Sequence, residues 1–206
     1  ESEETEVSGR AGLQTLADKT AAALTSRGIT SVTLNWRGTL FEGDSHLPAW
    51  DAQEVGGYEG HVGPMAIDAG RTAPGAYAFH EDAPGYVAQV FAKALTSSGV
   101  AVKLGKDGEA PTGGETLASV SSATMGEQLR WMLAHSDNTL ADQYCRLAAS
   151  AAGQPTTYAG AVAMVKADLV EASIPTRGMI LEDCSGLSTN DKLSANTLVG
   201  VLKASY

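Results

Sequence analysis

The sequence predicts an α/β (α+β) protein, with a first part of alternating helices and strands and a mostly helical second part. Two observations predict this. Up to about residue 104, helical patterns alternate with short strand-like runs, whereas later apolar residues recur mainly at helical spacing. A Gly- and Pro-rich stretch at residues 105–114 separates the two patterns and predicts a linker. We therefore expect two domains, an accessory α/β domain at residues 1–110 and a helical domain at residues 111–206.

The first part begins with a helix expected within residues 12–28, where apolar and small residues recur at helical spacing before a glycine stop. Apolar and polar residues alternate over residues 32–36, which predicts a half-buried strand, and residues 39–41 are expected to form its return strand. A second helix is predicted over residues 84–97, because proline suits a first turn and an apolar stripe follows it. Residues 100–104 are expected to form another strand.

The second part is expected to start with a strand at residues 117–121 and a short helix around residues 129–133. A further helix is predicted to start at Ser136, and another covers residues 162–169. A last helix is predicted to begin at Ser194, which can cap it. The helix from Ser136 is marked by Leu140, Tyr144 and Leu147, which recur at helical spacing.

Composition limits the function classes. The 206 residues include 24 acidic and 14 basic side chains, for a net charge of −10, which argues against nucleic acid as a partner and against binding to anionic lipid. The apolar runs are too short for a transmembrane segment. Because the sequence shows no signal peptide and starts with Glu1, we expect a mature, trimmed or truncated product.

The cysteines and histidines give weak signals. Cys145 and Cys184 could form a disulfide in an oxidising compartment, or they could be two buried thiols that do not meet. Three histidines, His46, His61 and His80, lack the spacing of metal ligands, so neither a zinc site nor another cofactor is expected.

The most informative stretch is Ser136-Asp137-Asn138, because Ser-x-Asn is one of three short motifs that form the active site of penicillin-recognising serine acyl-transferases. The other two, Ser-x-x-Lys and Lys-Thr-Gly, do not occur in the sequence. A hydroxyl at Ser136 can relay a proton, and the Asn138 amide can both donate and accept hydrogen bonds. The structural alternative is that Ser136 merely caps the next helix, with Asp137 stabilised near the helix start.

The stretch Asp183-Cys184-Ser185-Gly186 contains a serine beside a glycine, as some nucleophile motifs do. It lacks the Gly-x-Ser-x-Gly pattern, and no histidine partner can be recognised for it. We therefore interpret it as a tight turn that follows a strand at residues 179–181.

Two longer strings resemble one family. Residues 117–143, which include Ser136-Asp137-Asn138, are similar to the segment around the second motif of D-Ala-D-Ala carboxypeptidases of the low-molecular-mass class C penicillin-binding proteins. Residues 181–188 resemble the Asp-Gly-Ser-Gly-Leu-Ser stretch of the same family, and residues 191–199 resemble the helix after it. Upstream, Pro48-Ala49-Trp50, Tyr58 and residues 63–66 are similar to its accessory domain.

The resemblance implies a serine carboxypeptidase or endopeptidase whose second part is the helical portion of a penicillin-binding, β-lactamase-like transpeptidase domain. Ser136 would be the proton relay, and Asn138 would contact the substrate amide and the motif lysine. The acylated serine would lie upstream of Glu1, and Lys-Thr-Gly downstream of Tyr206. The substrates would be peptidoglycan stem peptides and β-lactams, met outside the cytoplasm. Cys184 stands where the family commonly has glycine, which adds a reason to suspect its bond to Cys145.

Two alternatives remain at the level of the sequence. The chain could be a non-catalytic module associated with the cell wall, with an accessory domain and a helical platform but no chemistry. It could also be an unrelated α/β binding domain in which Ser-x-Asn is an accidental helix cap.

Overall fold

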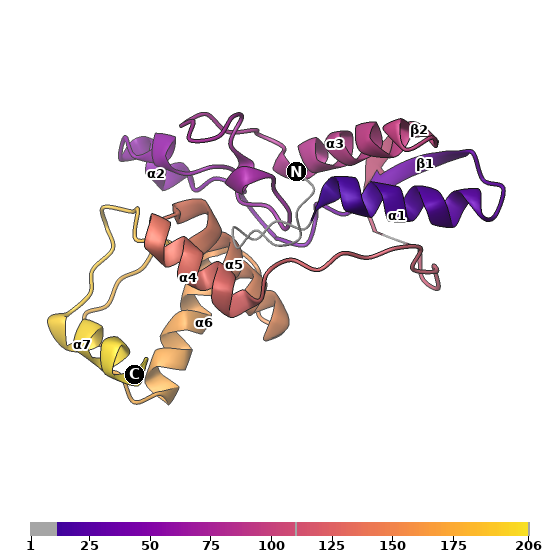
Figure 1. Ribbon diagram of the computed structural model, residues 1–206. Helices are drawn as coiled ribbons and strands as arrows, with labels where there is room; N and C mark the ends of the chain where they lie inside the picture. Colours follow the sequence, from indigo (N-terminus) through magenta and orange to yellow (C-terminus); the bar gives the residue numbers. More distant parts are fainter. Residues whose placement is uncertain (1–11, 110, 206) are drawn as a thin grey trace. The chain divides into compact units, whose positions relative to one another are not determined.

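The computed structural model describes residues 12–109 and 111–205, and it confirms the predicted α/β class (Figure 1). By their contacts, the residues form two compact units. Of the described residues, unit 1 comprises 12–39, 65–67, 82–109 and 111–136, and unit 2 comprises 40–64, 68–81 and 137–205. The units interleave along the chain, whereas the sequence suggested consecutive domains. This division by contacts does not test where the two predicted domains meet in the sequence, so the boundary between residues 110 and 111 stays a prediction.

Unit 1 contains a two-stranded parallel sheet covered by two helices. Strand β1 (Ser31–Trp36) pairs with β2 (Ala101–Asp107), and helices α1 (Leu13–Thr25) and α3 (Ala83–Ser97) pack beside it (Figure 1). The pairing starts with Ser31 opposite Ala101. Parallel strands need a long connection, which here includes α3. The core between the helices and the sheet consists of Ala17, Ala21, Leu24, Leu95 and Val100, with Val32 and Val102 packed against it.

The predicted helices and the first strand of unit 1 are confirmed, but two predicted strands are wrong. Residues 39–41 form a turn, because β1 pairs with β2 and the Gly38 N–H donates to Asp107 Oδ1 at 2.7 Å. Residues 117–121 form no strand. They lead to α4 (Met125–His135), which Thr124 and Glu127 start with reciprocal side-chain to backbone hydrogen bonds.

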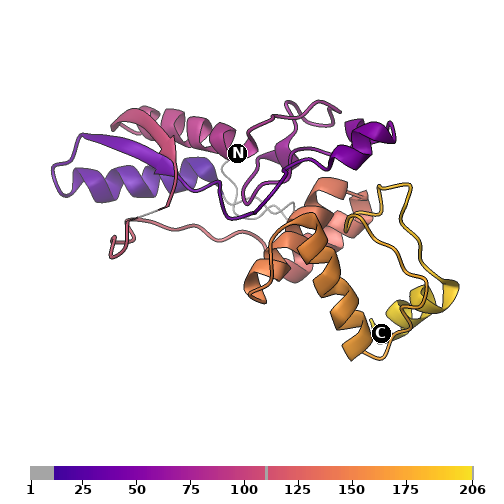
Figure 2. The same ribbon diagram turned by 180° about the vertical axis from the view of Figure 1, so that it is seen from behind.

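Unit 2 contains the short helices α2 (Pro48–Ala52), η1 (Gly56–Tyr58) and η2 (Asp68–Gly70) and the longer helices α5 (Asn138–Ala151), α6 (Tyr158–Glu171) and α7 (Ala195–Ala204). Helices α5 and α6 pack against each other (Figure 2). Trp50, Val62 and Tyr158 form a small apolar core. As predicted, Ser194 caps α7, and its Oγ accepts from the Thr197 N–H at 3.0 Å.

Helix α5 buries a mostly polar face, which the sequence analysis did not predict. Leu140, Tyr144 and Leu147 are only half-buried. The buried residues of this helix are Thr139, Asp142, Gln143, Arg146 and Ala149. Such burial requires hydrogen-bond partners for the polar groups. The Arg146 guanidinium has them, since it donates to the backbone carbonyls of Glu42, Asp44 and Thr156 at 2.7 to 2.9 Å.

Within residues 12–109 and 111–205, no helix is both long and apolar enough to cross a membrane.

Candidate active site

Ser136 does not cap the helix that follows it, so this part of the structural alternative is wrong. Ser136 ends α4 in the left-handed conformation, with φ 51° and ψ 49°, and its side chain is exposed. The cap of α5 is Asp137, whose Oδ1 accepts from the Leu140 N–H at 3.0 Å. A left-handed conformation is costly for serine, and such residues concentrate at functional sites. As the C-cap of α4, Ser136 donates its backbone N–H to the Met132 carbonyl, and a left-handed residue is a common way to end a helix.

Asn138 is the first residue of α5 and is half-buried. Its Nδ2 donates to the Tyr58 carbonyl over 3.3 Å. The next residue is held more firmly, because the Gly60 N–H donates to Thr139 Oγ1 at 2.9 Å and Thr139 is buried. Residues 58–60 thus lie along the first turn of α5 and limit how the Asn138 side chain can turn.

Asp137 is buried and contacts a residue that the sequence analysis missed. Its Oδ2 accepts from Arg71 Nη1 at 2.9 Å. The Arg71 guanidinium also lies over the Phe79 ring, 5.5 Å from the ring centroid. No spacing in the sequence connects Arg71 with Asp137, because 66 positions separate them. The predicted helix start near Asp137 indicated only that the negative charge of this residue would be stabilised there.

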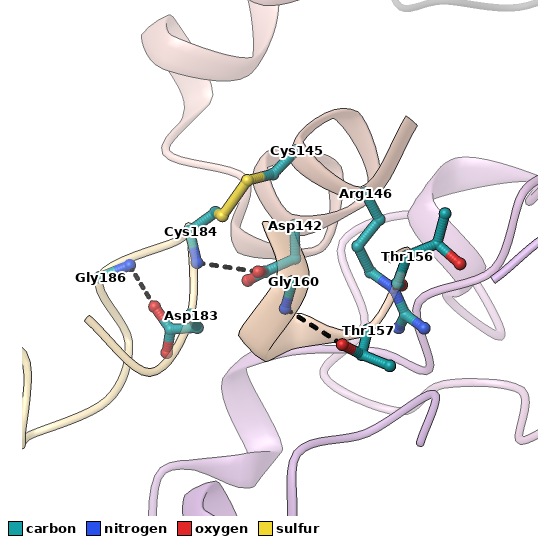
Figure 3. Close-up of a disulfide and its surroundings, with 9 residues drawn as sticks. All are labelled: Asp142, Cys145, Arg146, Thr156, Thr157, Gly160, Asp183, Cys184 and Gly186. Carbon is teal, nitrogen blue, oxygen red and sulfur yellow. Dashed lines mark hydrogen bonds between the residues drawn. A yellow bond between two sulfur atoms is a disulfide. The ribbon is translucent and has the colours of Figure 1, made fainter. Parts of the chain in front are cut away.

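A disulfide joins Cys145 in α5 to Cys184, the pairing that the sequence left open (Figure 3). Next to it, Asp142 Oδ1 accepts from the Cys184 N–H at 2.9 Å, as Figure 3 shows. The helix that begins at Asn138 is therefore attached to residues 182–188 by a covalent bond and a hydrogen bond, both one to two turns from its start.

Residues 182–188 form a tight loop around Asp183. The Asp183 carboxylate accepts from the N–H groups of Gly186 and Ser188 at 2.7 and 2.8 Å, the first of which Figure 3 shows. Gly186 has φ 77°, where a side chain would be strained. Ser185 Oγ donates to Glu59 Oε2 at 3.2 Å, and no histidine contact is among its hydrogen bonds. The tight turn predicted at residues 183–186 is thus present.

Two buried carboxyl groups, Glu59 and Asp142, face each other in unit 2. Burial raises the pKa of Glu59 to about 11, and the charge of Asp142 and a hydrogen bond to it add to this effect. The pKa of Asp142 is raised to about 6 by burial, even though the hydrogen bond from the Cys184 N–H opposes this rise. Near neutral pH, Glu59 is therefore protonated and can donate to Asp142. No sequence pattern indicated this pair, because a glutamate in a glycine-rich loop is usually exposed.

The histidines show an arrangement that their spacing did not indicate. The rings of His46 and His61 lie 5.2 Å apart, and His46 Nε2 is 3.1 Å from Asp51 Oδ1. Burial and the nearby His46 lower the pKa of His61. In the described part of the chain, no group of three or more His, Cys, Asp or Glu side chains could hold a metal ion. That the whole chain needs no metal or cofactor stays a prediction.

Comparison with known proteins finds the family that the Ser136-Asp137-Asn138 motif indicated. The model of the D-Ala-D-Ala carboxypeptidase 3 (S13) family matches residues 76–206, which include Ser136, Asn138 and both cysteines. The chain belongs to this family.

Two curated relatives extend the similarity over nearly the whole chain. Carboxypeptidase DacB of Mycolicibacterium smegmatis is 35% identical over 201 residues, which cover 95% of this chain and 42% of the relative. Carboxypeptidase Rv3627c of Mycobacterium tuberculosis is 34% identical over 182 residues, which cover 86% of this chain and 38% of the relative. The chain thus spans about two fifths of the length of these curated relatives.

Proposed function

We propose that this chain is part of a serine D-Ala-D-Ala carboxypeptidase or endopeptidase that hydrolyses peptidoglycan stem peptides through an acyl-enzyme. Family membership supports this proposal, and so does the position of Asn138 at a rigid helix start. In this mechanism a serine outside the 206 residues attacks the peptide carbonyl between the two D-Ala residues, and a base takes its proton. Water then hydrolyses the acyl-enzyme and restores the serine.

Ser136 and Asn138 have different roles in this proposal. The exposed Ser136 hydroxyl relays the proton to the leaving amine. The Asn138 amide, which can donate and accept, contacts the substrate amide and the motif lysine of the remaining chain. Asp137, the residue between them in the sequence, is buried and has no direct part in the chemistry. The alternation of exposed, buried and half-buried side chains over residues 136–138 supports this division.

The proposed partners and location follow from the chemistry. Penicillins and other β-lactams acylate the same serine and so would trap the complete enzyme. Peptidoglycan lies outside the membrane, so the enzyme would be extracytoplasmic, either periplasmic or secreted and associated with the cell wall. The disulfide between Cys145 and Cys184 supports this location, because such bonds persist in oxidising compartments. The further segments of the enzyme would supply Ser-x-x-Lys and Lys-Thr-Gly.

Alanine at Asn138 in the longer enzyme tests the function. We expect release of D-Ala from a D-Ala-D-Ala peptide to fall by about two to three orders of magnitude, as when a key polar group of an acyl-transfer site is removed. The melting temperature should change little, because the Asn138 bond to Tyr58 is long. Exposed Asn190, whose Nδ2 bonds Glu182, provides a matched Asn→Ala control. Wild-type activity in Asn138→Ala would refute the proposal and favour a non-catalytic module.

A further inference from the structure

A strained turn precedes Arg71. Asp68 and Ala69 have φ values of 50° and 51°, and Gly70 has φ 81°, so three successive residues are left-handed. Only glycine adopts this conformation readily. Non-glycine residues keep it only where surrounding contacts require it. Two contacts hold this turn. The Arg71 N–H donates a hydrogen bond to the Asp68 carbonyl at 3.0 Å, and a β-bridge joins Arg71 to Phe79.

The turn presents Arg71 to a buried acid. The Arg71 side chain is 19% exposed and the Asp137 side chain 3%, so their 2.9 Å ion pair is largely shielded from water. Arg71 Nη1 also approaches the Asp68 carbonyl at 3.4 Å. In such a setting the loss of one partner leaves a buried charge unpaired, which costs far more than the loss of a surface pair.

Asp137 uses its two carboxylate oxygens for different purposes. Oδ1 caps α5 through the Leu140 N–H, whereas Oδ2 pairs with Arg71. Asn138 follows directly, and its hydrogen bond to the Tyr58 carbonyl is long, at 3.3 Å. Its position is therefore set mainly by the backbone of the first turn, and this turn is fixed by Asp137 on one side and Thr139 on the other.

We propose that Arg71 is a positioning residue for Asn138, acting through its ion pair with Asp137. Without Arg71, the unpaired Asp137 carboxylate would turn toward water and shift the first turn of α5, and Asn138 with it. Arg71 itself contacts neither substrate nor reacting atoms. The proposal rests on the proposed function, because the direction of the Asn138 amide affects catalysis only if the chain is part of such a peptidase.

The test uses Arg71→Met, Arg71→Lys and the double variant Arg71→Met with Asp137→Asn. Asparagine caps a helix as well as aspartate but has no charge to leave unpaired. Arg27→Met is the matched control, because Arg27 forms an exposed ion pair with Glu115, in which the side chains are 43% and 66% exposed. The first measurement is hydrogen exchange of the Leu140 amide by NMR in the 206-residue chain. The second is kcat and KM of the longer enzyme for a D-Ala-D-Ala peptide.

In Arg71→Met we expect Leu140 exchange to accelerate, and kcat to fall, by about tenfold or more, with KM less affected. Arg71→Lys should lie between wild type and Arg71→Met, and the double variant should recover most of the exchange protection and of kcat. If Arg71→Met does not fold, the double variant and Arg71→Lys still give both measurements.

Two results would overturn the positioning role. One is a Leu140 exchange rate in Arg71→Met no different from that in Arg27→Met. The other is a double variant as impaired as Arg71→Met, since Arg71 would then not act through Asp137. Failure of the proposed function looks different, because Asn138→Ala would then keep full activity. If Asn138→Ala is inactive while Arg71→Met has normal kcat, only the positioning role is refuted.

Discussion

The Trp50 indole nitrogen donates a 2.8 Å hydrogen bond to Asp183 Oδ2, although 133 positions separate the two residues. Both are completely buried. The same carboxylate also accepts from the backbone of residues 186 and 188, so one acidic side chain fixes the shape of its loop and attaches it to α2. This loop is joined by the disulfide to the helix that begins at Asn138.

Trp50→Phe should therefore reduce stability by more than its lost volume implies. The change removes the donor and leaves the buried Asp183 oxygen with one acceptor site unused, at a cost of about 1–3 kcal/mol in addition to packing losses. Urea unfolding monitored by circular dichroism would measure it. Tyr77→Phe, at a side chain that is 72% exposed, is the control. Equal stabilities of the two variants would show that the Trp50 bond contributes nothing.

The carboxyl pair of Glu59 and Asp142 predicts that stability falls as pH rises. Both pKa values are raised, to about 11 and about 6, so the folded chain binds more protons than the unfolded chain. The stabilising effect is complete below the ordinary pKa values, and it is lost as the pH rises through about 6 for Asp142 and toward 11 for Glu59.

Glu59→Gln should flatten this dependence, because glutamine cannot titrate but still donates to Asp142. Between pH 7 and 9 we expect the slope, at most about 1.4 kcal/mol per pH unit for one proton, to decrease in the variant. Denaturant unfolding at several pH values would measure it. Glu115→Gln is the control, since the Arg27 partner lowers the pKa of this exposed group and it does not titrate in that range. An unchanged slope in Glu59→Gln would contradict the assignment.

Breaking the disulfide should destabilise unit 2. Cys145 and Cys184 are 39 positions apart, and a loop of this length corresponds to about 4 kcal/mol of chain entropy in the unfolded state. We expect Cys145→Ser with Cys184→Ser to unfold at a lower urea concentration than the oxidised protein, and reduction of the wild type to have the same effect. A reductant that leaves the midpoint unchanged, with free thiols confirmed by mass, would disprove the stabilising role.

Two glycine substitutions should have opposite signs. A Cβ on Gly160 would clash with the Pro155 carbonyl oxygen, whereas a Cβ on Gly126 would meet nothing within 4 Å. Both glycines are in the first turns of helices. Gly160→Ala should cost about 2 kcal/mol or more through overpacking, and Gly126→Ala should stabilise by up to about 1 kcal/mol. Thermal unfolding of both variants measures this, and stabilisation by Gly160→Ala would show that the close approach is relieved cheaply.

The 206-residue chain alone should not be acylated by penicillin. Its sequence contains neither Ser-x-x-Lys nor Lys-Thr-Gly, and Ser136 is proposed as a relay rather than a nucleophile. Intact mass spectrometry after incubation with a penicillin should show the unmodified mass of 21.2 kDa. The longer enzyme, treated in the same way, should gain one penicillin. A covalent adduct on the short chain would mean that one of its own serines is activated.

Local patterns predicted the helices and failed where long-range pairing decides. The helices at residues 13–25 and 83–97 follow their apolar periodicity and their stop signals. Residues 39–41 looked like a return strand, but β1 pairs instead with residues 101–107, and no local signal reports a parallel partner so distant in sequence.

The candidate site was only partly predictable for a similar reason. The motif at Ser136 and Asn138 is contiguous and could be recognised, whereas the contacts of Arg71, Glu59 and Trp50 join segments more than 60 positions apart. The apolar spacing that predicted α5 does not report which face of the helix is buried. Polar Asp142 and Arg146 are buried instead, with hydrogen-bond partners that only the folded chain brings near.

The partners of Arg146 affect how this family can diverge. Its guanidinium donates to backbone carbonyls of residues 42, 44 and 156, and every amino acid has such a carbonyl. Substitutions at those three positions therefore leave the acceptors in place as long as the backbone keeps its path. A change of Arg146 removes all three bonds together. Among related sequences, we expect the arginine to be retained while the residues whose carbonyls it binds vary.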